Sequence, residues 1–138
     1  MKYLPKHRGL FESCLGLNYK AQIIYLGPED GNNRIIILAT EEDLDYLANS
    51  SHWFADGTFD HVPLFDNMYS IHGDVHESIE ALIFALMPNR SEFEYVRFLK
   101  KLKELKPELA SWAGTLMHDC EMAALNAFEE EFPECEIS

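Results

Sequence analysis

The chain has 138 residues, of which 47% are hydrophobic and 12% aromatic, so it has enough apolar material for one folded domain and is not a disordered chain. Asp and Glu outnumber Lys and Arg by 24 to 11, and the formal net charge of −13 excludes strong binding of nucleic-acid phosphates by this chain alone. No apolar run approaches the roughly 20 residues of a membrane-spanning helix and no secretory signal is visible, so we expect a soluble intracellular protein without a membrane partner.

The first unit that we expect, residues 1–51, consists of an irregular N-terminal segment, a β-hairpin and a short helix. Residues 21–26 (AQIIYL) and 34–39 (RIIILA) are β-branched apolar runs, and a turn-forming segment, GPEDGNN, separates them. This pattern is typical of a hairpin. Thr40 and the acidic residues after it form an N-terminal capping signal, which predicts that a short helix follows the hairpin.

The second unit that we expect, residues 52–138, is an α/β domain. The predicted strands are residues 52–56, 67–72, 81–87, 115–118 and 134–138. The predicted helices are residues 91–106, which open with a capping motif at Ser91 and carry an apolar stripe, and residues 119–131. The order βββαβα, followed by a strand, is the opening of a ribonuclease-H-like fold, although many α/β domains share parts of it.

Two aspartates are candidate metal ligands. Asp56 precedes Gly57, and an Asp-Gly pair forms either a turn or, if Asp56 belongs to the first strand, a projecting metal ligand. Asp119 follows a predicted strand and is either the N-cap of the next helix or a ligand at the carboxyl end of that strand, where open α/β sheets bind their ligands. If the two strands are neighbours, the two carboxylates converge and need a cation between them. Mg²⁺ takes such oxygen ligands, and a pair of these ions supports phosphoryl transfer.

Several segments then resemble one family in order along the chain. Residues 53–59 (WFADGTF) resemble the signature around the first catalytic aspartate of the Mutator-like element (MULE) transposases. Residues 65–73 (FDNMYSIHG) resemble the family's FxQLYxIHG strand, and residues 82–90 (LIFALMPNR) resemble its apolar strand closed by PNK. Residues 118–133 (HDCEMAALNAFEEEFP) resemble its DFExAxxNA helix followed by FP. The resemblance covers about residues 34–138.

The resemblance implies a DDE-type transposase catalytic domain with a ribonuclease-H-like fold. Asp56 and Asp119 match the first two acids of the triad and are the implied catalytic and metal-binding residues. Cys120 stands where Phe is usual, which we interpret as a packing change, and Glu121 matches a further acid to which we give a secondary role. The family implies Mg²⁺ or Mn²⁺ as cofactor, DNA and a transposase-like oligomer as partners, and a nuclear location. Its reaction is the cleavage and transfer of DNA strands in transposition, a form of DNA recombination.

One departure affects the activity that we expect. The family continues beyond Phe-Pro with a GCxFH element and a helix that bears the third catalytic acid, whereas this sequence stops at Ser138. We therefore expect a domain truncated before the third acid, with weak metal binding and little activity alone. Two alternatives stay open: a transposase-derived non-catalytic binding or interaction protein, or a remnant without function; and an unrelated small acidic α/β binding domain in which Asp56 and Asp119 are only a turn and a cap.

Overall fold

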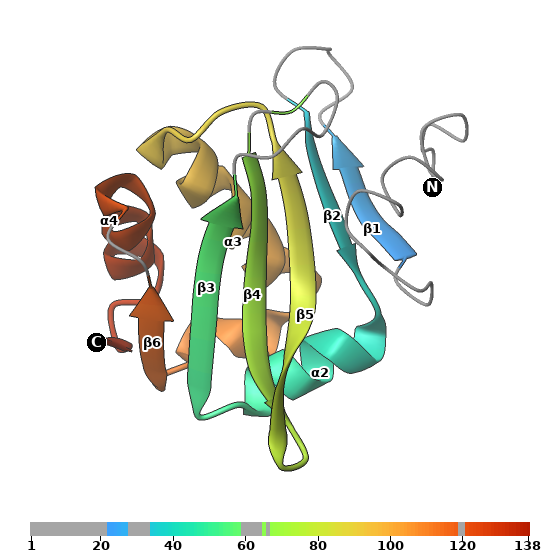
Figure 1. Cartoon of the computed structure of the whole chain (residues 1–138), viewed down its shortest axis with the longest axis vertical. Coiled ribbons are helices and arrows are strands. Elements are labelled where there is room, and N and C mark those ends of the chain that lie inside the picture. The colour runs from blue at the N-terminus through green and yellow to red at the C-terminus, as the bar shows by residue number, and fades with distance from the viewer. Residues whose placement is uncertain (1–21, 28–33, 59–64, 66, 119–120) are drawn as a thin grey trace.

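The computed structural model describes residues 22–27, 34–58, 65, 67–118 and 121–138 and shows a sheet packed against helices (Figure 1). The strands are β1 (Gln22–Gly27), β2 (Ile35–Ala39), β3 (His52–Thr58), β4 (Asn67–Val75), β5 (Ser78–Met87), β6 (Thr115–His118) and β7 (Glu136–Ile137). The helices are α2 (Glu41–Asn49), α3 (Glu92–Leu105), α4 (Met122–Glu131) and the 3₁₀ helix η1 (Pro107–Ser111). The predicted α/β class is confirmed.

The seven strands form one mixed sheet in the order β1-β2-β5-β4-β3-β6-β7. Neighbouring strands are antiparallel from β1 through β3, whereas β3 pairs with β6, and β6 with β7, in parallel. Since β4 is antiparallel to both of its neighbours, β3, β5 and β6 run in one direction and end at one edge of the sheet, at the top of Figure 1. We call this edge, where β3, β5 and β6 end, the carboxyl edge.

The predicted strands and helices are present among the described residues, with four differences. The last strand, β7, contains only Glu136–Ile137 of the predicted residues 134–138. The strands β3, β4 and β5 are longer than predicted, because long cross-strand pairing extends them beyond their apolar centres. The helix η1 was not predicted. The last helix begins at Met122 rather than at Asp119. Strand β2 pairs with β5, so the hairpin joins the same sheet, and the division of the chain at residues 51 and 52 stays a prediction.

The helices of the described residues cover the same face of the sheet. One core cluster contains residues of α2, α3, η1 and α4 together with every second residue of the central strands. On these strands the residues are Trp53 and Ala55 of β3, Tyr69 and Ile71 of β4, and Ile83, Ala85 and Met87 of β5, with Leu82 added beside the irregularity in the register of β4 and β5. Because successive side chains of a strand point to opposite faces, the residues between them lie on the face without helices. Figure 1 views the molecule from that uncovered face, with α3 behind the strands.

Two tryptophans join the start of β3 to its surroundings. The rings of Trp53 and Trp112 stack with centroids 3.6 Å apart and an interplanar angle of 8°. The Trp53 indole N–H donates to the Leu47 carbonyl at 3.0 Å, and the Trp112 indole N–H donates to the Ser50 carbonyl at 2.7 Å. Both indoles thereby satisfy their donors while burying large apolar surfaces. This contact anchors the strand that carries Asp56 to the end of α2.

The two predicted capping signals are present in different forms. Thr40 Oγ1 accepts from the Asp43 amide and the Asp43 carboxylate accepts from the Thr40 amide, each at 3.0 Å, which is a complete capping box for α2. Ser91 Oγ accepts from the Glu94 amide at 3.2 Å and caps α3. The Glu94 carboxylate does not complete a box, because it accepts from Arg97 at 2.7 Å instead. Strand β5 ends at the carboxyl edge and a short segment, residues 88–91, leads from it into α3. Helix α3 therefore starts at this edge.

Candidate functional site

The two predicted site residues follow paired positions of neighbouring parallel strands. In the register of β3 and β6, Ala55 is the partner of His118. Asp56 is the next residue after Ala55, and Asp119 is the next residue in the sequence after His118. The two strands are therefore neighbours, which is the condition for the two carboxylates to converge. Asp119 itself lies outside the described residues, so the convergence of the two carboxylates stays a prediction.

Asp56 belongs to the uncovered face of the sheet. It lies two residues beyond Phe54, which is 38% exposed on that face, and its own side chain is half-buried. Its cross-strand partner is Ser70, whose hydroxyl donates to the Asp56 backbone carbonyl at 3.4 Å. The Asp56 carboxylate is therefore near the carboxyl edge on a face that no helix of the described part covers.

Both structural alternatives for the aspartates are corrected. Asp56 and Gly57 lie inside β3, paired with Ser70 and Tyr69 of β4, so the interpretation of Asp-Gly as a turn is wrong. A Cβ added to Gly57 would lie 3.1 Å from Asn67 Oδ1 and 3.3 Å from Tyr69 Cδ1, so glycine serves close packing rather than a turn. The N-cap position of α4 is Glu121 rather than the predicted Asp119, because α4 starts at Met122.

A chain of polar side chains lies on the helix-covered side of the same edge. The Asn67 amide N–H donates to the Tyr95 hydroxyl at 3.0 Å, and the Tyr95 hydroxyl donates to Glu121 Oε1 at 2.7 Å. Asn67 and Tyr95 are each 1% exposed. A second contact joins the Tyr69 hydroxyl to His118 Nε2 at 2.6 Å. Tyr95 belongs to the apolar stripe that the sequence predicts for residues 91–106. The signal that was missed is that a buried phenol needs a hydrogen-bond partner.

The surroundings raise the pKa of both phenols above its ordinary value. For Tyr69 the main cause is burial, followed by the nearby Tyr95 hydroxyl and the negative charges of Glu121 and Asp56. For Tyr95 burial is again first, followed by the hydrogen bond to Glu121 and its charge, while the hydrogen bond from Asn67 opposes the shift. Both phenols are therefore neutral at physiological pH, and Tyr95 is a hydrogen-bond donor toward Glu121.

These shifts predict a loss of stability at alkaline pH. The pKa of Tyr95 is higher in the folded chain than its ordinary value of 10.0, so above about pH 10 the unfolded chain loses this proton first. The stabilisation is complete below that pH and declines as the pH rises. We expect the urea midpoint to fall between pH 9 and pH 11, and to fall less in Tyr95→Phe, which has no proton to lose. An equal fall in both proteins would contradict this assignment.

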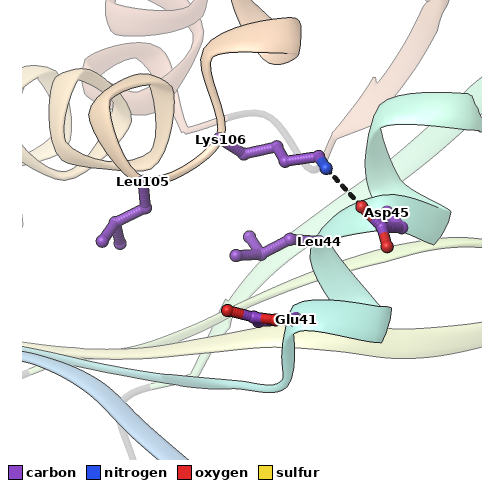
Figure 2. Close-up of a pocket in the computed structure, with 5 residues that line it drawn as sticks. All are labelled: Glu41, Leu44, Asp45, Leu105 and Lys106. Carbon is purple, nitrogen blue, oxygen red and sulfur yellow. Dashed lines mark hydrogen bonds and ion pairs between the residues drawn. The ribbon is translucent and has the colours of Figure 1, made fainter.

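A hollow of about 350 Å³ lies at the opposite edge of the sheet, between α2 and the end of α3 (Figure 2). Its lining residues are Glu41, Leu44, Asp45, Leu105 and Lys106. An ion pair between Lys106 and Asp45 crosses it. Because β2 leads into α2 at the edge opposite to the one where α3 starts, this hollow is separate from the region of Asp56.

Metal and membrane features are limited in the part of the chain that the structure describes. Among those residues, no group of three or more His, Cys, Asp or Glu side chains is arranged to hold a metal ion. Asp119 lies outside the described residues. No helix among the described residues is long and apolar enough to cross a membrane.

The fold and the position of Asp56 define a mixed α/β domain with an acidic side chain near the carboxyl edge of its sheet. The family model of the MULE transposase domain matches residues 52–138. The chain therefore belongs to the MULE transposase domain family, and the predicted resemblance is confirmed over this range. The alternative of an unrelated acidic domain is wrong. Neither a curated protein nor a solved structure matches the chain.

Proposed function

We propose that this chain carries the first two acids of a DDE-type transposase catalytic site, with Asp56 and Asp119 as its catalytic and metal-binding residues. The observation that carries the proposal is the parallel pairing of β3 with β6, with Ala55 opposite His118. Adjacent strands lie about 4.8 Å apart, so the residues that follow a matched pair start from neighbouring backbone positions. Two carboxylates at such positions are suitable ligands for Mg²⁺ or Mn²⁺.

The order of the elements supports a ribonuclease-H-like fold for this domain. After residue 52 the chain forms β3, β4 and β5, then α3, β6, α4 and β7. This is the predicted succession of three strands, a helix, a strand, a helix and a strand. The 3₁₀ helix η1 between α3 and β6 is the one addition within the described residues.

The uncovered face of the sheet supports a role in DNA chemistry. Asp56 belongs to that face beside the carboxyl edge, and no helix of the described residues covers the face there, which is compatible with the approach of a phosphodiester. Divalent ions, when bound, activate the attacking hydroxyl or water and stabilise the leaving oxygen of an in-line phosphoryl transfer. The net charge of −13 opposes tight DNA binding by this chain alone, so a transposase-like oligomer in the nucleus is the setting that we propose for strand cleavage and transfer.

A non-catalytic role is the second candidate, and the same net charge of −13 favours it. A transposase-derived binding protein needs the fold of the family but not two metal-binding acids. The two candidates differ in one measurable property, which is the dependence of metal binding and DNA cleavage on Asp56 and Asp119.

The test compares Mn²⁺ binding by calorimetry in the full chain, Asp56→Asn, Asp119→Asn and Glu77→Gln. Glu77 is exposed in the turn after β4, at the opposite edge of the sheet. Glu77→Gln removes the same charge there as the aspartate substitutions remove at the site. We expect at least a roughly tenfold loss of affinity in both aspartate variants and none in the control, because each aspartate supplies a ligand. Mn²⁺-dependent cleavage of a DNA strand is expected to follow the same pattern. Equal binding and equal cleavage in all four proteins would refute the proposed site.

A further inference from the structure

Three elements that are distant in sequence meet in the chain of Asn67, Tyr95 and Glu121. Asn67 is the first residue of β4, Tyr95 lies in the first turn of α3, and Glu121 directly precedes α4. The two hydrogen bonds that join them span 28 and 26 residues. The proposed metal chemistry does not use any of these three side chains, yet the Asn67–Tyr95 bond is buried and the Tyr95–Glu121 bond is partly buried at the edge where Asp56 lies.

Glu121 is held at both its side chain and its backbone. Its Oε1 accepts from Tyr95 at 2.7 Å, and its Oε2 lies 3.8 Å from the position that a Cβ on Gly57 would occupy. Its carbonyl accepts from the Leu125 amide at 3.1 Å, which closes the first turn of α4. The carboxylate thus connects the start of α4 to α3 and borders β3 next to Asp56.

The direction of Glu121 argues for positioning rather than metal binding. Asp56 belongs to the uncovered face of the sheet, whereas Glu121 is bonded to α3 on the covered side. A neutral phenol that donates a short hydrogen bond fixes the orientation of a carboxylate without neutralising it. The small size of Gly57 leaves room for this packing, since a side chain at that position would meet Asn67 and Tyr69.

We propose that Glu121 is a positioning residue, held by Tyr95 and Asn67, that fixes the start of α4 relative to β3. Asp119 is two residues before Glu121 in the sequence, so we propose that this contact also matters for the metal-binding pair. The inference rests on the proposed function for its consequence, the geometry of the metal-binding pair. Its structural part, the anchoring of α4, is measurable without metal.

The first experiment separates a positioning role from a ligand role in the full chain by Mn²⁺ calorimetry. Tyr95→Phe and Glu121→Leu remove the hydrogen bond, and we expect each to weaken Mn²⁺ binding about tenfold. Glu121→Gln keeps a carbonyl that accepts from Tyr95 but removes the charge, so binding within about twofold of the unmodified chain is expected. A loss in Glu121→Gln as large as that in Glu121→Leu would overturn the proposal, because Glu121 would then be a ligand.

The second experiment uses amide hydrogen exchange without metal. We expect the Leu125 amide in the first turn of α4 to exchange about tenfold faster in Tyr95→Phe and Glu121→Leu, while the buried turns of α3 keep their rates. Tyr46→Phe is the matched control, since it removes a phenol hydroxyl that contacts His76 at 3.4 Å at the opposite edge.

The two experiments distinguish failure of the proposed function from failure of the positioning role. Absence of Asp56-dependent Mn²⁺ binding in the unmodified chain would refute the proposed function, and the exchange rates would then decide the anchoring role by themselves. Unchanged exchange at Leu125 in both Tyr95→Phe and Glu121→Leu would overturn the positioning role, whatever the metal data show.

Discussion

Replacing Trp53 by alanine is expected to lower the free energy of unfolding by about 3–5 kcal/mol. Trp53 is fully buried, stacks on Trp112 with centroids 3.6 Å apart, and meets the edges of Phe128 and Phe132. The change leaves a large cavity between β3, η1 and α4. It also removes the indole donor that lies 3.0 Å from the Leu47 carbonyl, which then keeps only its bond from the Ser50 amide at 3.2 Å, and the lost hydrogen bond adds to the cost.

Urea denaturation followed by circular dichroism measures this loss. Phe93→Ala is the control, because Phe93 is 68% exposed and its truncation is expected to change stability by less than about 0.5 kcal/mol. If Trp53→Ala does not fold, Trp53→Phe keeps part of the aromatic packing and is expected to give a smaller loss of the same kind. A loss below about 1 kcal/mol for Trp53→Ala would contradict its place in the core.

Gly114→Ala is expected to be the second most damaging change, with a loss of about 3 kcal/mol, at the upper end of typical overpacking. A Cβ at this position would lie 2.3 Å from the Ser51 carbonyl oxygen and 2.6 Å from Trp112 Cζ2. The carbonyl has no freedom to move away, because it accepts from the Thr115 amide at 2.9 Å. The Gly114 carbonyl in turn accepts from the Glu136 amide at 3.0 Å. Relief of the clash therefore disturbs the pairing at both sides of β6.

Gly27→Ala is the matched control for this substitution. Its added Cβ would meet the Tyr25 side chain, with the hydroxyl oxygen at 3.1 Å, and the far end of a side chain moves at little cost. We expect its midpoint in urea to shift much less than that of Gly114→Ala. Equal shifts in the two variants would show that the loss at Gly114 does not come from the backbone contact with Ser51.

The hydrophobic pattern was sufficient to predict most of the elements. Alternating or continuous apolar runs predicted the central strands, and the apolar stripe with Ser91 before it predicted α3, because these signals depend on neighbours along the chain. The capping box at Thr40 was predicted for the same reason. The candidate acids Asp56 and Asp119 were found by their place at the ends of strands and by the family resemblance.

Contacts between distant segments decided the features for which the sequence allowed alternatives. Asp-Gly is compatible with a turn or a strand in isolation, and the pairing of Asp56 with Ser70 of β4 decides for the strand. Local preference favours Asp119 as a helix cap, but α4 starts at Met122, with Glu121 bonded to Tyr95. Such partners lie 26 residues apart, so no local pattern reveals them.

The sequence by itself determined the α/β class, the family and the residue types available for chemistry, because composition, periodicity and short motifs are properties of neighbouring residues. Only the tertiary structure decided that β3 and β6 are parallel neighbours in the register of Ala55 and His118, and that Asp56 and Glu121 belong to opposite sides of one edge. The physical reason is that sheet pairing and buried hydrogen bonds join segments whose separation along the chain carries no information about their distance in space.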